Sequence, residues 1–579
     1  MEYVKTSPTK RRKSFTGSRP RDASLGTRSQ QDSVRNGIIP RNETMLQAFE
    51  WYLPGVSLTV PNEQERPAGQ EISHWQRLIH LLPDLKASGI TSIWIPPACK
   101  ATWPDDNGYG IHDLWDLGEF DTKGGVATKW GHKDDLVRLG EQVKKVGISL
   151  IFDAVLNHRA AADGTEQIEV VRCDEQDRNK ILDEEPFTIE AWTRFPYGSR
   201  KGKYSAMQYD KSCFNGTDWD QSTGKQEIYK FCGTRKDGTK QDWAQDVDCL
   251  ENGNNDMLMF ANLDYGNIEV RDDVKRWGEW LVDHLPGIGG MRLDAMKHYS
   301  VGFVKDFVAH VNAAAARQGK EMFWIGEYWN ADSKYLLEYN EKHIDYSINM
   351  FDVALLYNLH NASAGRLTDL RKVFHGSMVS MAPDKAVTFI ANHDTQETQT
   401  SEAPIEPWFV PHAYALILLR DAGTPCVFWG DLYGTQGPRA REPACGGKLI
   451  RLLRARNQYA HGRQTDYFDD KNCIGWTRYG TPTASNGTGL AVLICNAWSW
   501  KKKRMFVGKS AVGQVWSDLM GFCWSGVLID KEGFGDFVVG PRSISIWTWK
   551  DADGRKEIDA LIYPAQPVLD HEDNRNGHE

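Results

Sequence analysis

The sequence has no apolar run long enough to cross a membrane and no dense cysteine framework. A membrane-spanning helix needs about 18 or more predominantly apolar residues in succession, and no stretch of this 579-residue chain supplies them. The ten cysteines include no C-x-x-C pair, so we expect them to remain thiols. The N-terminus also lacks the apolar core of a secretory signal. These absences predict a cytoplasmic protein without a membrane partner.

The charge balance excludes another class of partner. The formal net charge is −9, which argues against binding of nucleic acid by the body of the protein. The contents of 40% hydrophobic and 25% charged residues are typical of a soluble globular protein. The length exceeds that of one ordinary domain. We therefore expect a multidomain monomer that binds no nucleic acid.

Four strand-like runs in the sequence end in polar residues. The runs are 148–152, 288–293, 322–325 and 386–391, and they lead to Asp153, Asp294, Glu327 and Asp394. Glu327 follows Asp294 by 33 residues and Asp394 follows Glu327 by 67, which is about one and two strand-helix units. Carboxylates that follow successive parallel strands converge on one face of a (β/α)8 barrel. The spacing therefore predicts such a barrel with an acidic site.

Further runs complete the predicted barrel. The segments 47–52, 91–97, 347–351 and 425–431 read as its other strands, and residues 72–85 carry apolar side chains at helical spacing. Arg292 stands two residues before Asp294, so the two side chains point to the same side of a strand. A cation in that position favours the ionised form of the carboxyl group, as a nucleophile requires.

The four stretches together resemble the four signature regions of the α-amylase family of glycoside hydrolases. They read DAVLNH from Asp153, GMRLDAMKH from Gly290, GEYW from Gly326 and ANHD from Ala391. The similarity extends over about residues 44–550 and is greatest to the liquefying bacterial-type enzymes and to intracellular fungal members. It implies retaining, internal hydrolysis of α-1,4-glucans such as glycogen, starch or maltooligosaccharides.

The chain divides into segments of different character. The interval between Asp153 and Asp294 is 141 residues, so roughly a hundred are inserted beyond one strand-helix unit. The predicted fold is α/β: a (β/α)8 TIM barrel with an irregular β subdomain inserted after strand 3 and a C-terminal antiparallel β-sandwich. The predicted divisions are a disordered basic tail at 1–41, the barrel at 42–157 and 266–460, the insert (domain B) at 158–265, the sandwich (domain C) at 461–550 and an acidic tail at 551–579.

The resemblance implies a role for each matching residue. Asp294 would be the nucleophile and Glu327 the acid/base. Asp394 would support the charged transition state. The substrate-binding positions implied by the family are Tyr109, Asp153, His158, Arg292, Lys297, Trp329, Asn392 and His393.

The resemblance also implies bound Ca²⁺. Calcium takes oxygen ligands from carboxylates, amides and backbone carbonyls. The matching positions are Asn157, Asp256, Asn262 and the carbonyl of His298. A second cation would be held by Asp218, Asp242 and Asp264, although Gly266 stands where the family usually has another acid.

Other interpretations of the same residues remain open. A structural ion pair at the mouth of a barrel explains any single Arg-x-Asp. An α-glucan transferase of the same fold uses the same first step and differs in the acceptor. A sugar-binding relative without activity would lack one or more of the three carboxylates, and all three stand in this chain.

Overall fold

Eight parallel strands close into a barrel. The computed structural model describes residues 42–57, 72–481 and 488–561, so the predicted N-terminal tail lies outside the described residues. Each barrel strand pairs in parallel with both of its neighbours. In order around the barrel the strands are β1 Met45–Gln47, β18 Thr424–Phe428, β17 Ala386–Thr388, β16 Asn349–Phe351, β15 Phe323–Gly326, β14 Ile288–Leu293, β7 Ser149–Ala154 and β4 Ser92–Trp94.

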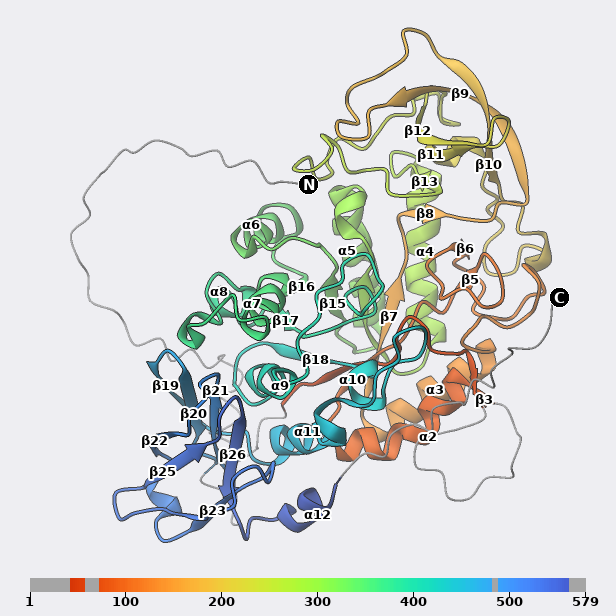
Figure 1. Cartoon of the computed structure of the whole chain (residues 1–579). Coiled ribbons are helices and arrows are strands. Elements are labelled where there is room, and N and C mark those ends of the chain that lie inside the picture. Colours follow the sequence, from red (N-terminus) through yellow and green to blue (C-terminus); the bar gives the residue numbers. More distant parts are fainter. Residues whose placement is uncertain (1–41, 58–71, 482–487, 562–579) are drawn as a thin grey trace, which may run out of the picture. The chain divides into compact units, whose positions relative to one another are not determined.

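Helices alternate with these strands along the chain and lie outside the barrel (Figure 1). The longer ones are α2 His74–Ala87, α3 Lys133–Val146, α4 Ile268–His284, α5 Val301–Arg317, α6 Ser333–Ile344, α7 Val353–Ser363, α9 Val410–Leu418 and α11 Leu449–Gln458; α8 Met378–Met381 and α10 Trp429–Tyr433 are short. No helix within the described ranges has the length and apolar character needed to span a membrane. The alternation confirms the predicted (β/α)8 barrel.

Local sequence signals explain where several elements begin and end. Ser73 and Gln76 form a capping box at the start of α2, which satisfies two otherwise orphaned backbone donors. Gly147 ends α3 with a left-handed backbone, φ 67°, which glycine adopts without steric cost. A Cβ at Gly290 of β14 would lie 2.2 Å from the carbonyl oxygen of Phe323. Glycine at this position therefore permits the close approach of β14 to β15.

Four predicted strand runs end earlier than expected: β4 stops at Trp94 and β17 at Thr388, and the runs at 47–52 and 425–431 also stop short. The run at 47–52 was expected to be a strand, but β1 ends at Gln47 because the buried carboxylate of Glu50 accepts hydrogen bonds from the backbone N–H groups of Tyr52 and Gln436. These bonds fold the chain into a turn. The run at 425–431 is β18 only as far as Phe428, after which α10 begins.

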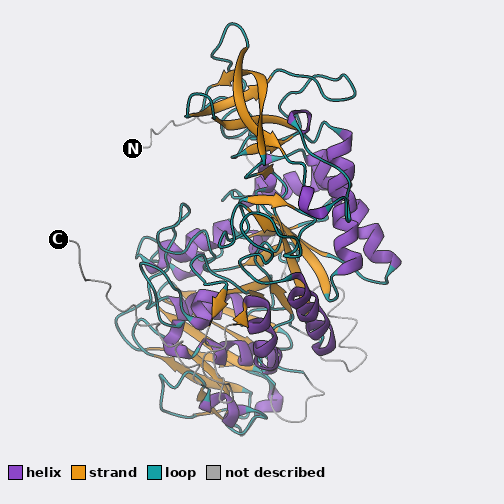
Figure 2. Cartoon of the chain, turned by 90° about the vertical axis from the view of Figure 1, so that its right-hand side faces the viewer, coloured by secondary structure: helices purple, strands orange, loops and turns teal. Residues whose placement is uncertain are grey.

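The segment between β7 and α4 forms a sheet of its own. Its six strands pair antiparallel in the order β10-β9-β12-β11-β13-β8, and Figure 2 shows them apart from the barrel strands. They are β8 His158–Arg159, β9 Gly164–Cys173, β10 Phe187–Arg194, β11 Phe214–Asp220, β12 Lys225–Phe231 and β13 Ala261–Leu263. Small two-stranded pairs form from β2 Val56–Ser57 with β3 Ile72–Ser73 and from β5 Lys100–Ala101 with β6 Ile111–Asp113.

Two antiparallel sheets follow the barrel. The larger has the order β19-β20-β21-β26-β23-β24, and the smaller pairs β22 with β25. Met505 and Phe537 of the smaller sheet share one buried cluster with Leu493 and Trp547 of the larger, as in a β-sandwich. The strands are β19 Gln464–Asp470, β20 Cys473–Arg478, β21 Leu490–Cys495, β22 Lys501–Phe506, β23 Val515–Asp518, β24 Val527–Leu528, β25 Phe534–Val539 and β26 Ile544–Trp549.

The predicted acidic tail starts too early. Within 551–579 the structure places helix α12 Arg555–Ala560, in which Ile558 is buried. Arg451 of α11 donates hydrogen bonds to the carbonyl oxygens of Asp559 and Leu561, at 2.7 and 2.8 Å. The mean acidity of the segment concealed the buried apolar residues Ala552 and Ile558 and these carbonyl acceptors, which hold it against the barrel. Residues 562–579 lie outside the described residues.

Candidate active site

One buried guanidinium joins three carboxylates at the carboxyl ends of neighbouring strands. Arg292 of β14 lies directly opposite Asp153 of β7 in the strand register. Its Nη1 atom contacts Oδ1 of Asp153 at 2.8 Å and Oδ1 of Asp294 at 2.7 Å, and its Nη2 contacts Oε2 of Glu327 at 2.9 Å. The arginine side chain is 1% exposed, so these contacts act in a medium that screens charge weakly. The structure thus brings Asp153, Arg292, Asp294 and Glu327 together.

Each of the two candidate reacting carboxylates keeps one oxygen available. Oε2 of Glu327 also accepts the backbone N–H of Ala295 at 2.7 Å. Within the described part of the chain, Oδ2 of Asp294 and Oε1 of Glu327 accept no hydrogen bond. The Asp294 and Glu327 side chains are 11% and 17% exposed. Both groups are therefore held from behind by Arg292 and open to an incoming molecule.

Asp153 is held on its other side by two aromatic side chains. Its Oδ2 atom accepts Nε1–H of Trp94 at 2.9 Å and the hydroxyl of Tyr109 at 3.0 Å. Tyr109 was a predicted site residue, whereas the sequence analysis missed Trp94. Because Trp94 ends β4, the strand-end rule that located the carboxylates would also have located this side chain. The bonds use every oxygen of Asp153, which indicates a positioning role.

Asp394 contacts His393, and a glutamine fixes that histidine. Nε2 of His393 lies 3.3 Å from Oδ2 of Asp394, while Nδ1 of His393 lies 3.0 Å from Nε2 of Gln47. If the amide of Gln47 donates to Nδ1, the imidazole carries its hydrogen on Nε2, facing Asp394. Gln47 was not predicted, although it ends β1 and is fully buried.

Flat side chains line the site beside the carboxylates. The rings of Tyr109 and His393 are stacked with their centroids 5.1 Å apart, and Trp51 lies nearly parallel to both. His158 contacts the carbonyl oxygen of Tyr109 through Nε2 at 2.8 Å. Such parallel rings present a flat wall to a ligand. Trp51 was not predicted, because it lies in a turn beyond β1.

Three further predicted residues have protein partners of their own. Oδ1 of Asn392 accepts the backbone N–H groups of Asp394 and Thr395, so this side chain shapes the turn that presents Asp394. Lys297 pairs with Glu251 at 2.7 Å, and Trp329 donates its indole N–H to the hydroxyl of Tyr357 at 3.0 Å. For Asn392, these bonds support an indirect role.

The site carries more acid than base. Burial raises the pKa of Asp294 above its ordinary value of 3.8; the charge of Arg292 opposes this shift, and that of Glu327 adds to it. Burial likewise raises the pKa of Asp153 and Asp394. Burial, with the charge of Arg292, lowers the pKa of His393 to about 3, so this histidine is neutral at pH 7. The single buried cation among several carboxyl groups couples their protonation, because a change of charge on one alters the field at the others.

The residues predicted to bind calcium converge on one point between the insert and the barrel. The amide Nδ2 of Asn157 lies 2.8 Å from the carbonyl oxygen of His298 and 3.2 Å from Oδ1 of Asn262, with the carbonyl oxygen of Asp256 at 3.3 Å. The side chain of Asp256 is buried nearby, and burial raises its pKa to about 7. An oxygen-rich cage of this kind suits a hard cation. The donor set fits calcium with only one carboxylate.

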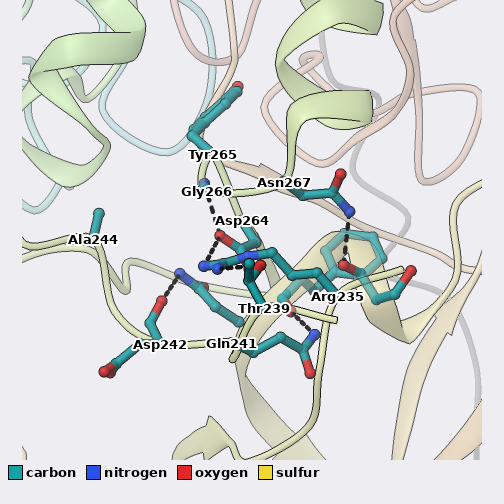
Figure 3. A network of polar contacts seen from close by, with 12 residues as sticks. Arg235, Thr239, Gln241, Asp242, Ala244, Asp264, Tyr265, Gly266 and Asn267 are labelled. Carbon is teal, nitrogen blue, oxygen red and sulfur yellow. Dashed lines mark hydrogen bonds and ion pairs between the residues drawn. The ribbon is translucent and has the colours of Figure 1, made fainter. Parts of the chain in front are cut away.

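The second predicted cation site is not formed. Within the described ranges no three acidic, histidine or cysteine side chains gather as a metal site. Asp264 instead accepts two hydrogen bonds from Arg235, at 2.7 and 3.0 Å (Figure 3). Asp242 pairs with Lys230. Asp218 accepts the backbone N–H of Phe260 at 3.1 Å. The chain supplies its own cations to Asp242 and Asp264, so these carboxylates are not arranged as the possible second cation site.

Gly266 explains part of this arrangement. A Cβ at this position would lie 2.3 Å from Nη2 of Arg235, so an acidic side chain at 266 would compete for the space that the guanidinium occupies. The departure from the family pattern at Gly266 therefore accompanies the placement of Arg235 against Asp264.

Comparison with known proteins identifies the family. A family profile described as the catalytic domain of alpha amylase matches residues 59–480. The chain belongs to the α-amylase family. Over 511 residues it is 42% identical to a glucan 1,4-alpha-maltohexaosidase of Bacillus sp. strain 707, with 88% of this chain and 93% of that protein covered. The α-amylase of Bacillus licheniformis is also 42% identical, with 87% of this chain and 93% of that protein covered. The family consists of glycoside hydrolases.

Two other comparisons extend the family assignment. A protein named cytoplasmic alpha-amylase in Escherichia coli K12 is 36% identical, with 88% of this chain and 99% of that protein covered. The crystal structure of an α-amylase from Geobacillus thermoleovorans matches with a TM-score of 0.53 at 16% identity, covering 88% of this chain and 98% of the other. That structural likeness supports the fold of the α-amylase family.

Proposed function

We propose that this protein is an α-amylase that cleaves internal α-1,4-glucosidic bonds with retention of configuration. The observation that carries the proposal is the single guanidinium of Arg292 that bridges Asp294 and Glu327. Retaining glycosidases hold their two carboxyl groups about 5–5.5 Å apart, whereas inverting enzymes separate them by about 6.5–9.5 Å. Two carboxylates on the two Nη atoms of one planar group suit the closer spacing.

The proposed chemistry divides into two steps. Oδ2 of Asp294 attacks the anomeric carbon, the glycosidic C–O bond breaks, and Glu327 gives its proton to the leaving oxygen. Glu327 then takes a proton from water, and the resulting nucleophile cleaves the glycosyl ester to release Asp294. Arg292 contacts both carboxyl groups, and its charge favours the ionised form of the nucleophile Asp294.

The remaining residues are proposed to hold the sugar. The ring of Tyr109 supplies a flat face, and His158, His393 and Asp394 supply hydrogen-bonding groups beside it. Lys297 and Trp329 lie on the segments that follow β14 and β15, and we assign them to the neighbouring sugar units. Asn392 contributes through the turn that carries Asp394.

A bound calcium ion is the proposed cofactor. Asn157, Asp256, Asn262 and the carbonyl of His298 would hold it, because these oxygen-bearing groups converge there. The ion would fasten the inserted sheet to the ends of β7 and β14 and has no part in bond cleavage. It would thereby keep one wall of the site in place.

The proposed setting is the cytoplasm, with glycogen or a related α-1,4-glucan as substrate and the monomer as the active form. The cytoplasmic name of the Escherichia coli relative supports the setting, and the maltohexaosidase name of the Bacillus relative supports the substrate class.

Incubation of the pure protein with maltoheptaose tests the activity. Hydrolysis predicts products shorter than the substrate and none longer. Longer products formed early would identify a glucan transferase. An unchanged substrate would indicate a sugar-binding protein without activity.

A further inference from the structure

Domain C presents two exposed tryptophans on one short loop. The loop between β21 and β22 carries Trp498 and Trp500, whose exposed fractions are 80% and 61%. A single exposed apolar side chain is ordinary, but two large aromatic rings two residues apart form a contiguous apolar surface. We call this segment, residues 496–500, the tryptophan loop. Its exposed apolar surface suggests a binding site.

An arginine supports the first of these rings from behind. The guanidinium carbon of Arg542 lies 4.7 Å from the centre of the Trp498 ring and 3.6 Å from that of Trp408, so its charge is placed between the two indoles. The backbone of Arg542 is left-handed, with φ 46°, a conformation that costs free energy in a residue other than glycine. Its N–H donates to the carbonyl oxygen of Ala497 at 2.9 Å. The left-handed backbone of Arg542 therefore accompanies the contacts that position Trp498.

The rest of the loop is also fastened to its surroundings. A Cβ at Gly540 would lie 3.7 Å from the ring of Trp500, so this ring rests beside bare backbone. Asn496 donates its side-chain amide to the carbonyl oxygen of Thr368 at 2.9 Å, and its backbone N–H donates to Asn472. Rings held in advance lose little conformational entropy when a ligand stacks on them.

The charges beside the loop favour a neutral ligand. Strand β22 begins with Lys501, Lys502, Lys503 and Arg504, which would otherwise suggest an acidic partner. Lys501 pairs with Asp470 at 2.9 Å, Lys503 pairs with Asp469, and Arg504 pairs with Asp530. Local acids neutralise these three cations, and the guanidinium of Arg542 already lies against the rings of Trp408 and Trp498. The aromatic faces therefore stand in a weaker positive field than the basic run of β22 would produce alone.

We propose that the tryptophan loop is a second α-glucan-binding site, separate from the catalytic carboxylates. Sugar rings present apolar faces that stack on indole, and their hydroxyls carry no charge, which matches this surface. The ligand class rests on the proposed function. Trp408, whose ring contacts Arg542, lies in the connection from β17 to α9, which also carries Asp394. A long glucan held here would lie on the same loop system that presents a catalytic group.

Native electrophoresis through a gel containing glycogen tests the site. The protein is used as its full chain with Glu327→Gln, which stops digestion of the gel. Trp498→Ala combined with Trp500→Ala should raise the apparent dissociation constant for glycogen roughly tenfold, because two stacking faces are lost. In the active protein the same pair of changes should leave kcat/KM for maltoheptaose unchanged, since this short substrate is cleaved at the carboxylates.

Two controls make the result specific. Trp524→Ala removes a tryptophan that is 96% exposed on another loop of domain C and should leave retardation by glycogen as it was. Trp498→Tyr keeps an aromatic face and should preserve most of the retardation by glycogen. The melting temperature should be unchanged in every variant.

The outcomes separate this inference from the proposed function. Equal retardation of the double variant and its parent overturns the second site, even if hydrolysis is observed. Retardation of the parent by heparin instead of glycogen, lost in the double variant, also overturns it and identifies an anionic partner. Retardation that depends on both tryptophans in a protein that cleaves no glucan would support the site and contradict the hydrolase.

Discussion

Nη2 of Arg292 lies 2.9 Å from Oε2 of Glu327, while Nη1 of the same guanidinium bonds to Asp294. One buried cation therefore orients the two groups to which we assign opposite tasks, an ionised nucleophile and a protonated acid. Their shared partner couples their charges, since protonation of one changes the field at the other. The predictions below test that coupling and the parts of the fold that support it.

Removal of either carboxyl group should abolish turnover without unfolding the protein. Asp294→Asn and Glu327→Gln keep the size of each side chain but remove the nucleophile or the acid, which typically costs several orders of magnitude in kcat. Steady-state cleavage of maltoheptaose measures this effect. Glu338→Gln, at a surface acid on α6 that pairs with Lys342, is the matched control. Activity within about tenfold of the parent in either site variant would refute its assigned role.

The acid side of the pH profile should respond to Asp153. Burial raises the pKa of Asp294, and the charge of Asp153 adds to that shift. Asp153→Asn removes a negative neighbour, so Asp294 should ionise at lower pH and the acid limb of kcat/KM should move to lower pH, although kcat itself falls. Asp431→Asn, which removes a buried carboxyl bonded to Tyr414, should leave the limb in place. An unmoved limb in Asp153→Asn would contradict the proposed coupling.

Calcium should stabilise the protein through Asp256. Prolonged chelation should lower the melting temperature, because an ion that binds only the folded state adds to its stability. Protein purified without added calcium should contain about one ion per chain by metal analysis. In Asp256→Asn, added calcium should no longer shift the melting temperature. An unchanged melting temperature in chelator, with no metal found, would exclude the proposed ion.

Arg235 should stabilise the folded protein by neutralising the buried carboxylate of Asp264. The Asp264 side chain is 2% exposed and its partner Arg235 is 14% exposed, so Arg235→Met leaves a buried carboxylate without its cation. Loss of one partner of such a pair costs about 3–5 kcal/mol of unfolding free energy. Urea denaturation measures the loss. Adding Asp264→Asn should restore most of the stability, whereas a double variant as unstable as the single one would show that the charge is not the cause.

The sequence predicted those features that depend on short, local patterns. Asp153, Asp294 and Glu327 could be placed because each stands at the end of an apolar run, and the barrel brings such ends together. Asn157, Asp256 and Asn262 converge as predicted, although they lie in distant parts of the chain, because the motifs carried that information. Their roles in catalysis and metal binding remain predictions.

Features that depend on partners distant in the sequence were missed. Gln47 contacts His393, which is 346 residues away in the sequence, and no local sequence pattern predicts that contact. The pairing of Asp264 is of the same kind. Asp264 is acidic in any sequence pattern, but Arg235 reaches it only once β12 and β13 have both paired with β11. Helix α12 was hidden by the acidity around it, since Ile558 is one apolar residue among charged ones.

A trapped glycosyl-enzyme tests the central claim most directly. In Glu327→Gln, α-maltosyl fluoride should still react, because fluoride leaves without a proton, while the missing base slows the release of the sugar. Intact mass and peptide mapping should then find one maltosyl group esterified to Asp294. The absence of this adduct, with β-configured sugar released first from the parent enzyme, would contradict a retaining mechanism at Asp294.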